Sequence, residues 1–224
     1  MFRENDSLGG KDPYSASKAC VEFACLSWYH SFVNRSLLED NQISLTTARA
    51  GNVIGGGDWS ENRLIPDCIR SINNQNTLHL RNPKATRPWQ HVLDCLNGYL
   101  LLAQYKYCTP TQNEFDSFNF GPPESSQRSV RSVVEEVQTY LTNLQFSVAG
   151  HETTMHEAGL LQLDINKASN TLAWNNQWDF KRAIKETVDW YIKENQGLST
   201  YDITLEQVDL YLEEETNLDA TIES

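Results

Sequence analysis

The sequence has no long apolar run, no closely paired cysteines and no excess of basic residues. The apolar runs all fall short of about 18 residues, which excludes a membrane-spanning helix. The five cysteines are an odd number without a Cys-x-x-Cys pair, so they indicate reduced thiols in a cytoplasmic protein. No apolar core follows Arg3, and we therefore expect no signal peptide at this end of the sequence.

The charge is concentrated at one end of the chain. The formal net charge is −12, but residues 201–224 contain eight acidic residues and neither Lys nor Arg. Acidic and basic side chains are nearly balanced among the remaining residues and form no basic stripe. This argues against a nucleic acid as a binding partner. A small anionic ligand stays compatible with this balance, because one or two well-placed arginines are enough to bind it.

What is present favours a folded α/β chain. Of the 224 residues, 39% are hydrophobic and 10% aromatic, which is too apolar for a disordered protein. Asp12 followed by Pro13 is typical of a helix start. Periodicity predicts helices over residues 13–32, 63–72, 94–104, 129–144, 165–173 and 180–195, and strands over 43–48, 77–81, 118–120 and 145–149. Alternating strands and helices indicate an α/β layered fold, with too few strands for a complete doubly wound sheet.

The acidic terminus carries a helix-start pattern of its own. Thr204 followed three residues later by Gln207 has the form of a capping box. One interpretation is a solvated acidic helix that docks on the body of the protein, and the other is a tail that binds a partner.

Tyr14 and Lys18 are four residues apart on the first predicted helix. This spacing places the two side chains one above the other. An ammonium beside a phenol favours the phenolate, which predicts a general base or acid. A surface tyrosine beside a lysine is the plainer interpretation of the same spacing.

A glycine-rich segment over residues 49–58 follows a predicted strand, where ligands bind in open α/β sheets. It predicts a tightly turning loop, in which Asn52 offers both a donor and an acceptor to a sugar or a phosphate. Arg87 is suited to grip a diphosphate, and Arg63 is a second candidate. The alternatives are an ordinary turn and surface salt bridges.

A metal site is not predicted. His151 and His156 are five residues apart, whereas two zinc ligands on one helix face need a spacing of four. His91 lies in an apolar setting, and we interpret it as a core or shell residue whose hydrogen bonds are satisfied, in preference to a ligand.

Three motifs in order carry a resemblance to a known family. LGGKDPYSASK at 8–18, RAGNVIGGGDW at 49–59 and RPWQHV at 87–92 resemble segments of the extended short-chain dehydrogenases/reductases, with an NAD(P)-binding Rossmann-like fold. Within that family the pattern is most similar to the nucleotide-sugar 4,6-dehydratases that act on CDP-glucose. Segments at 163–168, 172–174 and 187–191 resemble the carboxyl-terminal lobe of those enzymes, so the resemblance covers about residues 2–196.

The resemblance implies a lyase that uses bound NAD. Tyr14 would take the proton from the sugar C4 hydroxyl, and Lys18 would assist it and hold the nicotinamide ribose. The 4-keto sugar would then lose water across C5 and C6, and the hydride would return to C6, so that NAD is regenerated within the cycle. Both Tyr14 and Lys18 are therefore implied catalytic and cofactor-binding residues.

The resemblance also implies the residues that bind the nucleotide sugar. Asn52 would contact the sugar or diphosphate, Arg63 and Leu64 would line the nucleotide pocket, and Arg87 would clamp the diphosphate. Glu157 would contact the substrate ribose. The partner implied is CDP-glucose, with neither a nucleic acid nor a membrane.

The same resemblance implies a domain organisation. Residues 1–50 are predicted to be a remnant of the NAD-binding domain, 51–196 further Rossmann elements interleaved with the substrate lobe, and 197–224 an acidic helical tail. The upstream units with the glycine fingerprint and the Ser/Thr that completes the catalytic set are not in the sequence, so we expect a fragment without activity of its own. We also expect exposed apolar residues on the first helix and pairing of two copies through it.

Three functions stay open on the sequence. The chain could contribute to a CDP-glucose 4,6-dehydratase reaction, or to that of another nucleotide-sugar epimerase or dehydratase. It could also be a module that binds a nucleotide sugar without turnover.

Overall fold

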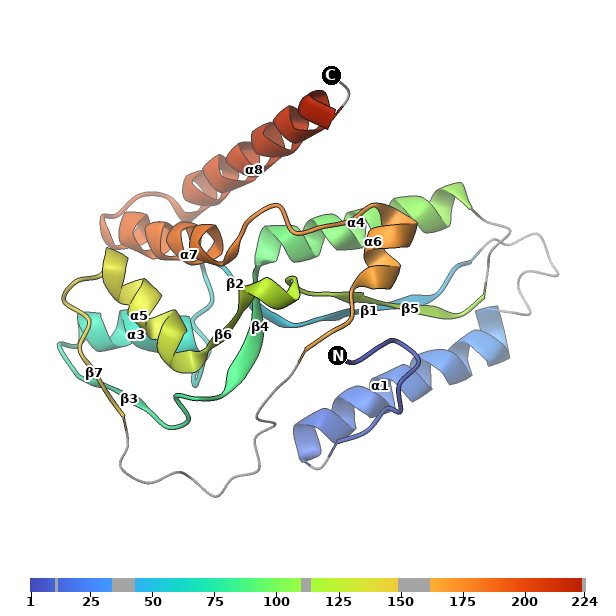
Figure 1. Ribbon diagram of the computed structural model, residues 1–224, viewed down its shortest axis with the longest axis horizontal. Coiled ribbons are helices and arrows are strands. Elements are labelled where there is room, and N and C mark those ends of the chain that lie inside the picture. The colour runs from blue at the N-terminus through green and yellow to red at the C-terminus, as the bar shows by residue number, and fades with distance from the viewer. Residues whose placement is uncertain (11, 34–42, 110–113, 149–161, 223–224) are drawn as a thin grey trace. The chain divides into compact units, whose positions relative to one another are not determined.

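The computed structural model describes residues 1–10, 12–33, 43–109, 114–148 and 162–222 (Figure 1). These residues form an α/β structure with parallel strand pairs, as the sequence predicts. The chain divides into two compact units. Unit 1 is made of Met1–Ala50, Leu96–Phe120 and Leu163–Asn175, and unit 2 of Gly51–Cys95, Gly121–Gln162 and Asn176–Ser224.

Unit 1 is built around one parallel strand pair. Strand β1 (Thr46–Ala50) runs parallel to β5 (Asp116–Phe120), with Thr46 opposite Asp116. Helix α6 (Asn166–Leu172) and the part of α4 (Val92–Cys108) within this unit also belong to it. Its core consists of Leu102, Phe118, Phe120, Ala168, Leu172 and Trp174.

Helix α1 (Pro13–Trp28) begins at the predicted residue and continues as a π-helical turn over Tyr29–Val33. The Asp12 carboxylate accepts hydrogen bonds from the backbone N–H groups of Tyr14 and Ser15, both at 3.0 Å. This cap satisfies two of the donors that a helix start leaves unpaired.

Helix α1 presents large apolar side chains to solvent, as the sequence predicts. Val21, Phe23 and Trp28 are each more than half exposed, as is Phe32 in the π-helical turn that follows. Within the described part of the chain, β1 pairs with β5 alone, so one edge of β1 has no strand beside it. Together these features give unit 1 an uncovered apolar surface.

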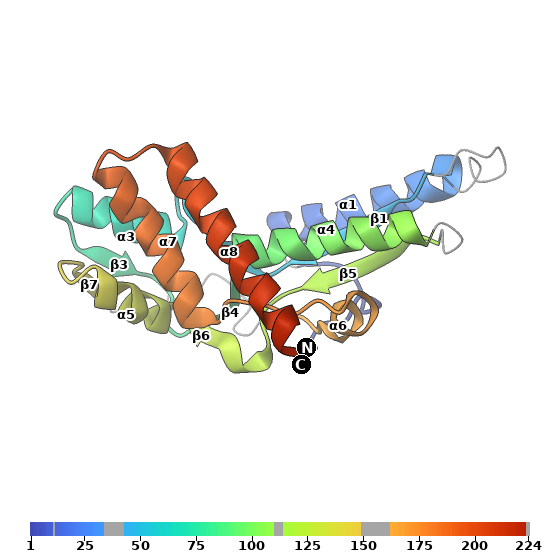
Figure 2. The same ribbon diagram turned by 90° about the horizontal axis from the view of Figure 1, so that it is seen from above.

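Among its described residues, unit 2 contains short strands, the start of α4 and four further α-helices (Figure 2). Strands β2 (Asn52–Ile54), β4 (Thr86–His91) and β6 (Gln127–Ser129) form one sheet in the order β2-β4-β6, and β3 (Leu78–Leu80) pairs with β7 (Phe146–Val148). The helices are α3 (Leu64–Asn73), α5 (Val130–Tyr140), α7 (Phe180–Asn195) and α8 (Thr200–Ile222), and a short 3₁₀ turn, η3, spans Glu124–Ser126.

Helices α5 and α7 bring their apolar faces together in the core of unit 2. Val133, Val134 and Val137 of α5 are fully buried with Ile184 and Val188 of α7. Three valines at spacings of one, three and four residues lie on one side of a helix, which is why the sequence pattern located this face correctly.

The structure corrects several predicted elements. Residues 52–54 form β2 within the predicted loop, because they pair with Trp89–His91 of β4. The strand predicted over 43–48 begins at Thr46, and the helix predicted over 129–144 ends at Tyr140. Strands β4 and β6 were not predicted, since each depends on a partner distant in the sequence.

The prediction of a capping box that starts at Thr204 is wrong. Helix α8 already begins at Thr200, and the Thr204 hydroxyl donates to the Thr200 carbonyl at 2.8 Å. The helix docks on α7, in agreement with one of the two interpretations of the acidic terminus. No helix among the described residues has the length and apolar character needed to span a membrane.

His91 at the end of β4 is buried, as the sequence predicts, but the expectation that its hydrogen bonds are satisfied is wrong for one ring nitrogen. Its ring has no exposed surface, Nδ1 accepts a hydrogen bond from the Leu93 N–H at 3.3 Å, and Nε2 is buried without a hydrogen-bond partner in the described structure. Burial lowers the pKa of His91 from 6.5 to about 3. The ring is therefore neutral in the folded protein at ordinary pH.

We predict that His91 makes the protein less stable in mild acid. Below its ordinary pKa the unfolded state takes up a proton that the folded state does not bind, so stability falls as the pH drops from about 6.5 towards 3. Near pH 5 this costs about 2 kcal/mol of unfolding free energy. Urea unfolding near pH 7 and near pH 5 should show a smaller loss for His91→Gln than for the original chain, and an equal loss would contradict the prediction.

Candidate functional site

A cavity of about 450 Å³ lies within unit 2. It is bounded by β2, by the start of α3, by β3 and the residues that follow it, and by β4. Four of the residues predicted to bind substrate line it, namely Asn52, Arg63, Leu64 and Arg87. The structure thus brings together side chains from three separate parts of the sequence.

Two paired strands position Asn52 and Arg87. Asn52 lies opposite Trp89 in the parallel register of β2 and β4, and Arg87 is two residues before Trp89. A Cβ at Gly51 would come within 2.8 Å of the Pro88 carbonyl, so only glycine permits this close approach of the chains. The Trp89 indole donates to the Arg128 carbonyl at 3.1 Å, which fixes one wall of the cavity.

The cavity is suited to an anion. Arg63, Arg81 and Arg87 line it, and each presents a guanidinium that can grip a phosphate in a bidentate manner. Helix α3 starts at Leu64 without a side-chain cap, and its first residues Leu64 and Ile65 line the same space. Unpaired N–H groups and the positive end of the helix dipole add to the attraction for negative charge.

Two carboxylates at the cavity are already engaged. Asp67 pairs with Arg70 at 2.5 Å. Burial raises the pKa of Asp58, but hydrogen bonds from Ser60 and the charges of Arg63 and Arg70 outweigh it, so the pKa lies below its ordinary value. Asp58 is therefore ionised at neutral pH, and it partly offsets the positive charge of the arginines.

Tyr14 and Lys18 lie together on α1 in unit 1. The Lys18 ammonium is 5.5 Å from the centroid of the Tyr14 ring, as the four-residue spacing predicts. The Tyr14 side chain is 69% exposed, so its hydroxyl is open to a ligand. Their predicted catalytic and cofactor-binding roles stay predictions.

Glu157, predicted to contact the substrate ribose, lies outside the described residues, as do His151 and His156. Asn62 and Arg81 line the cavity but were not singled out in the sequence. The Arg81 guanidinium donates to the Asn62 side-chain oxygen at 3.2 Å. The available signal was position, because Arg81 is the last residue of the predicted strand and thus lies at its carboxyl end.

Comparison with known proteins places these features in context. A family model described as GDP-mannose 4,6 dehydratase matches residues 1–187. The CDP-glucose 4,6-dehydratase of Salmonella typhimurium is 40% identical over 190 residues, which are 85% of this chain and 53% of that protein. The chain spans about half the length of the curated relatives it matches.

Solved structures show the same fold. The dTDP-glucose 4,6-dehydratase of Bacillus anthracis, in complex with NAD, matches with a TM-score of 0.62 at 21% identity. The match covers 87% of this chain and 57% of the Bacillus chain. MoeE5 in complex with UDP-glucuronic acid and NAD has a TM-score of 0.70 at 18% identity, with 87% and 60% covered. The described residues therefore adopt the Rossmann-like fold of the extended short-chain dehydrogenases/reductases.

We predict that Arg87→Ala weakens the binding of CDP, used as a nucleoside-diphosphate probe. Loss of a charged hydrogen-bond donor costs about 1.5–3 kcal/mol, which is about a ten- to hundred-fold increase in Kd. Isothermal titration calorimetry measures the change. The control is Arg131→Ala, because Arg131 pairs with Glu135 on the surface of α5. Equal affinities for the two variants would show that Arg87 does not bind the diphosphate.

Proposed function

Because the chain belongs to the GDP-mannose 4,6 dehydratase family, we propose that it contributes the substrate site and the catalytic base of a nucleotide-sugar 4,6-dehydratase that converts CDP-glucose to CDP-4-keto-6-deoxyglucose. The chain covers about half of its relatives, so the proposal concerns an enzyme in which the remaining part is also present.

The observation that carries the proposal is the convergence of Asn52, Arg63, Leu64 and Arg87 on one cavity. A nucleoside diphosphate sugar combines an anionic centre with two polar ring systems. Arginines and an open helix start suit the diphosphate, and the Asn52 amide suits a sugar hydroxyl. The 40% identity to a CDP-glucose 4,6-dehydratase favours CDP-glucose among such substrates.

Tyr14 and Lys18 supply the proton chemistry. The exposed Tyr14 side chain, in its deprotonated phenolate form, takes the proton from the C4 hydroxyl of the sugar as a general base. Lys18 stabilises the phenolate by its charge, and its ammonium together with the phenol suits the hydroxyl groups of a cofactor ribose. NAD, when bound, supplies the acceptor and donor of the hydride, and the net reaction removes one water from the sugar.

The proposal includes a cytoplasmic location and pairing of two copies through α1. Reduced thiols support the first, since Cys20 and Cys108 are exposed and unpaired. The exposed apolar residues of α1 support the second.

The test is reconstitution. Residues 1–224 are assayed with CDP-glucose and NAD, alone and together with the part of the Salmonella enzyme that this chain does not cover. We expect the 4-keto-6-deoxy product only in the mixture. A 4-epimer as product would favour an epimerase, whereas CDP-glucose binding without turnover in either assay would favour a binding module.

Tyr14→Phe in the reconstituted enzyme should lower kcat by about 10²–10⁴-fold, because the general base is lost while the ring is kept. The control is Tyr107→Phe, since the Tyr107 side chain is 87% exposed on α4. Steady-state turnover together with circular dichroism of both variants separates loss of chemistry from loss of folding. Turnover by Tyr14→Phe that matches the control would rule out Tyr14 as the base.

A further inference from the structure

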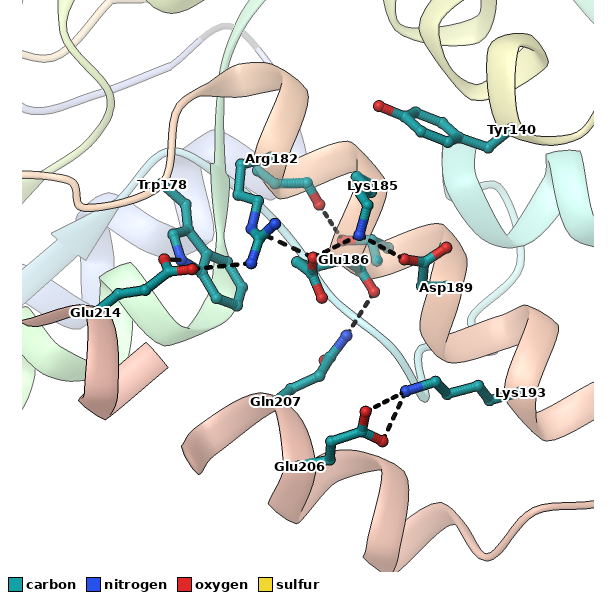
Figure 3. A network of polar contacts seen from close by, with 12 residues as sticks. Tyr140, Trp178, Arg182, Lys185, Glu186, Asp189, Lys193, Glu206, Gln207 and Glu214 are labelled. Carbon is teal, nitrogen blue, oxygen red and sulfur yellow. Dashed lines mark hydrogen bonds and ion pairs between the residues drawn. The ribbon is translucent and has the colours of Figure 1, made fainter. Parts of the chain in front are cut away.

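Helix α8 lies beyond residues 1–187, the part of the chain that the family model matches. One face of α8 is held on α7 by a set of polar contacts (Figure 3). Gln207 donates to the Glu186 carbonyl at 2.6 Å, the Lys193 ammonium pairs with Glu206, and Arg182 with Glu214. Ile203 joins the core of unit 2 with 1% of its surface exposed. The helix is therefore part of the folded unit.

A further contact between α7 and α8 leads towards the cavity. The Trp190 indole N–H on α7 donates to the Thr204 hydroxyl oxygen on α8 at 3.0 Å. The Thr204 proton is directed to the Thr200 carbonyl, so the hydroxyl oxygen is left to accept the bond from the indole. Trp190 is 5% exposed, and this bond fixes the orientation of a buried indole.

The indole lies directly against the glycine-rich loop. A Cβ at Gly56 would come within 2.0 Å of Trp190 Cγ, so no other residue fits there while the indole keeps its place. Gly57, with φ of +79°, also faces this ring at van der Waals distance from an added Cβ. The path of the loop therefore depends on where the indole lies.

The neighbouring side chain holds the end of the same loop. The Tyr191 hydroxyl donates to the Asp58 carbonyl at 2.6 Å, and Tyr191 is fully buried. Gly55 and Asp58 line the cavity, as does Asn52 at the start of the preceding strand. Two adjacent residues of α7 thus fix the loop that forms one wall of the cavity.

We infer that α8 is a positioning element for the nucleotide site, with Trp190 as the positioning residue and Thr204 as its anchor. The docked helix holds the indole against Gly56 and so sets the shape of the cavity wall from Gly55 to Asp58. This inference rests on the proposed function where it concerns the nucleotide, but the coupling of α8 to the loop does not depend on it.

The experiment compares three variants of the full chain. Thr204→Val keeps the shape of the side chain and removes the acceptor for Trp190. Gln207→Leu is the matched control, because it removes a buried contact between α8 and α7 that does not reach the loop. Thr204→Ser keeps the hydroxyl. Hydrogen exchange of peptides covering residues 52–62 reports on the loop, and calorimetry reports on CDP binding.

We expect Thr204→Val to speed exchange in residues 52–62 and to weaken CDP binding, each by about three- to ten-fold, since one hydrogen bond is lost. Gln207→Leu and Thr204→Ser should stay within about two-fold of the original chain in both measurements. If hydrogen exchange in the loop is faster in Thr204→Val but no form of the chain binds CDP, the coupling of α8 to the loop is supported. The same result contradicts the proposed nucleotide site. Unchanged loop exchange in Thr204→Val, equal acceleration in Gln207→Leu, or a serine variant that behaves like valine would overturn the inference.

Discussion

The packing of α7 is the constraint on which unit 2 depends. Ile184 and Val188 bury the face that meets α5, and Trp190 and Tyr191 hold the loop that follows β2. A single helix therefore contributes to the core and to a wall of the cavity. Because a close-packed interior transmits displacement with little compression, the site and the core cannot shift independently.

The positive charge of the cavity comes from arginines at three different structural elements. Arg63 precedes α3, Arg81 follows β3, and Arg87, six residues further on, lies on β4. Three like charges around one space repel each other and favour a bound anion. The ionised Asp58 moderates this repulsion while the cavity is empty of ligand. The charges around the cavity thus favour an anion before one binds.

Local chemistry explains what the sequence could predict. The Asp12 cap and the Tyr14–Lys18 pair depend on residues within one or two turns of a helix, and both were located correctly. The strands β2, β4 and β6 depend on pairing between distant segments, so their existence or bounds were missed. Arg81 was overlooked for the same reason, since its place in the cavity comes from tertiary structure.

Helix α1 has a consequence for assembly. Val21 and Trp28 follow Tyr14 by seven and fourteen residues, which puts them on the same side of the helix as the tyrosine and Lys18. A protein surface that shields these apolar groups from water also lies beside the Tyr14 hydroxyl. Burial of the apolar side of α1 and enclosure of the Tyr14 hydroxyl are then one event.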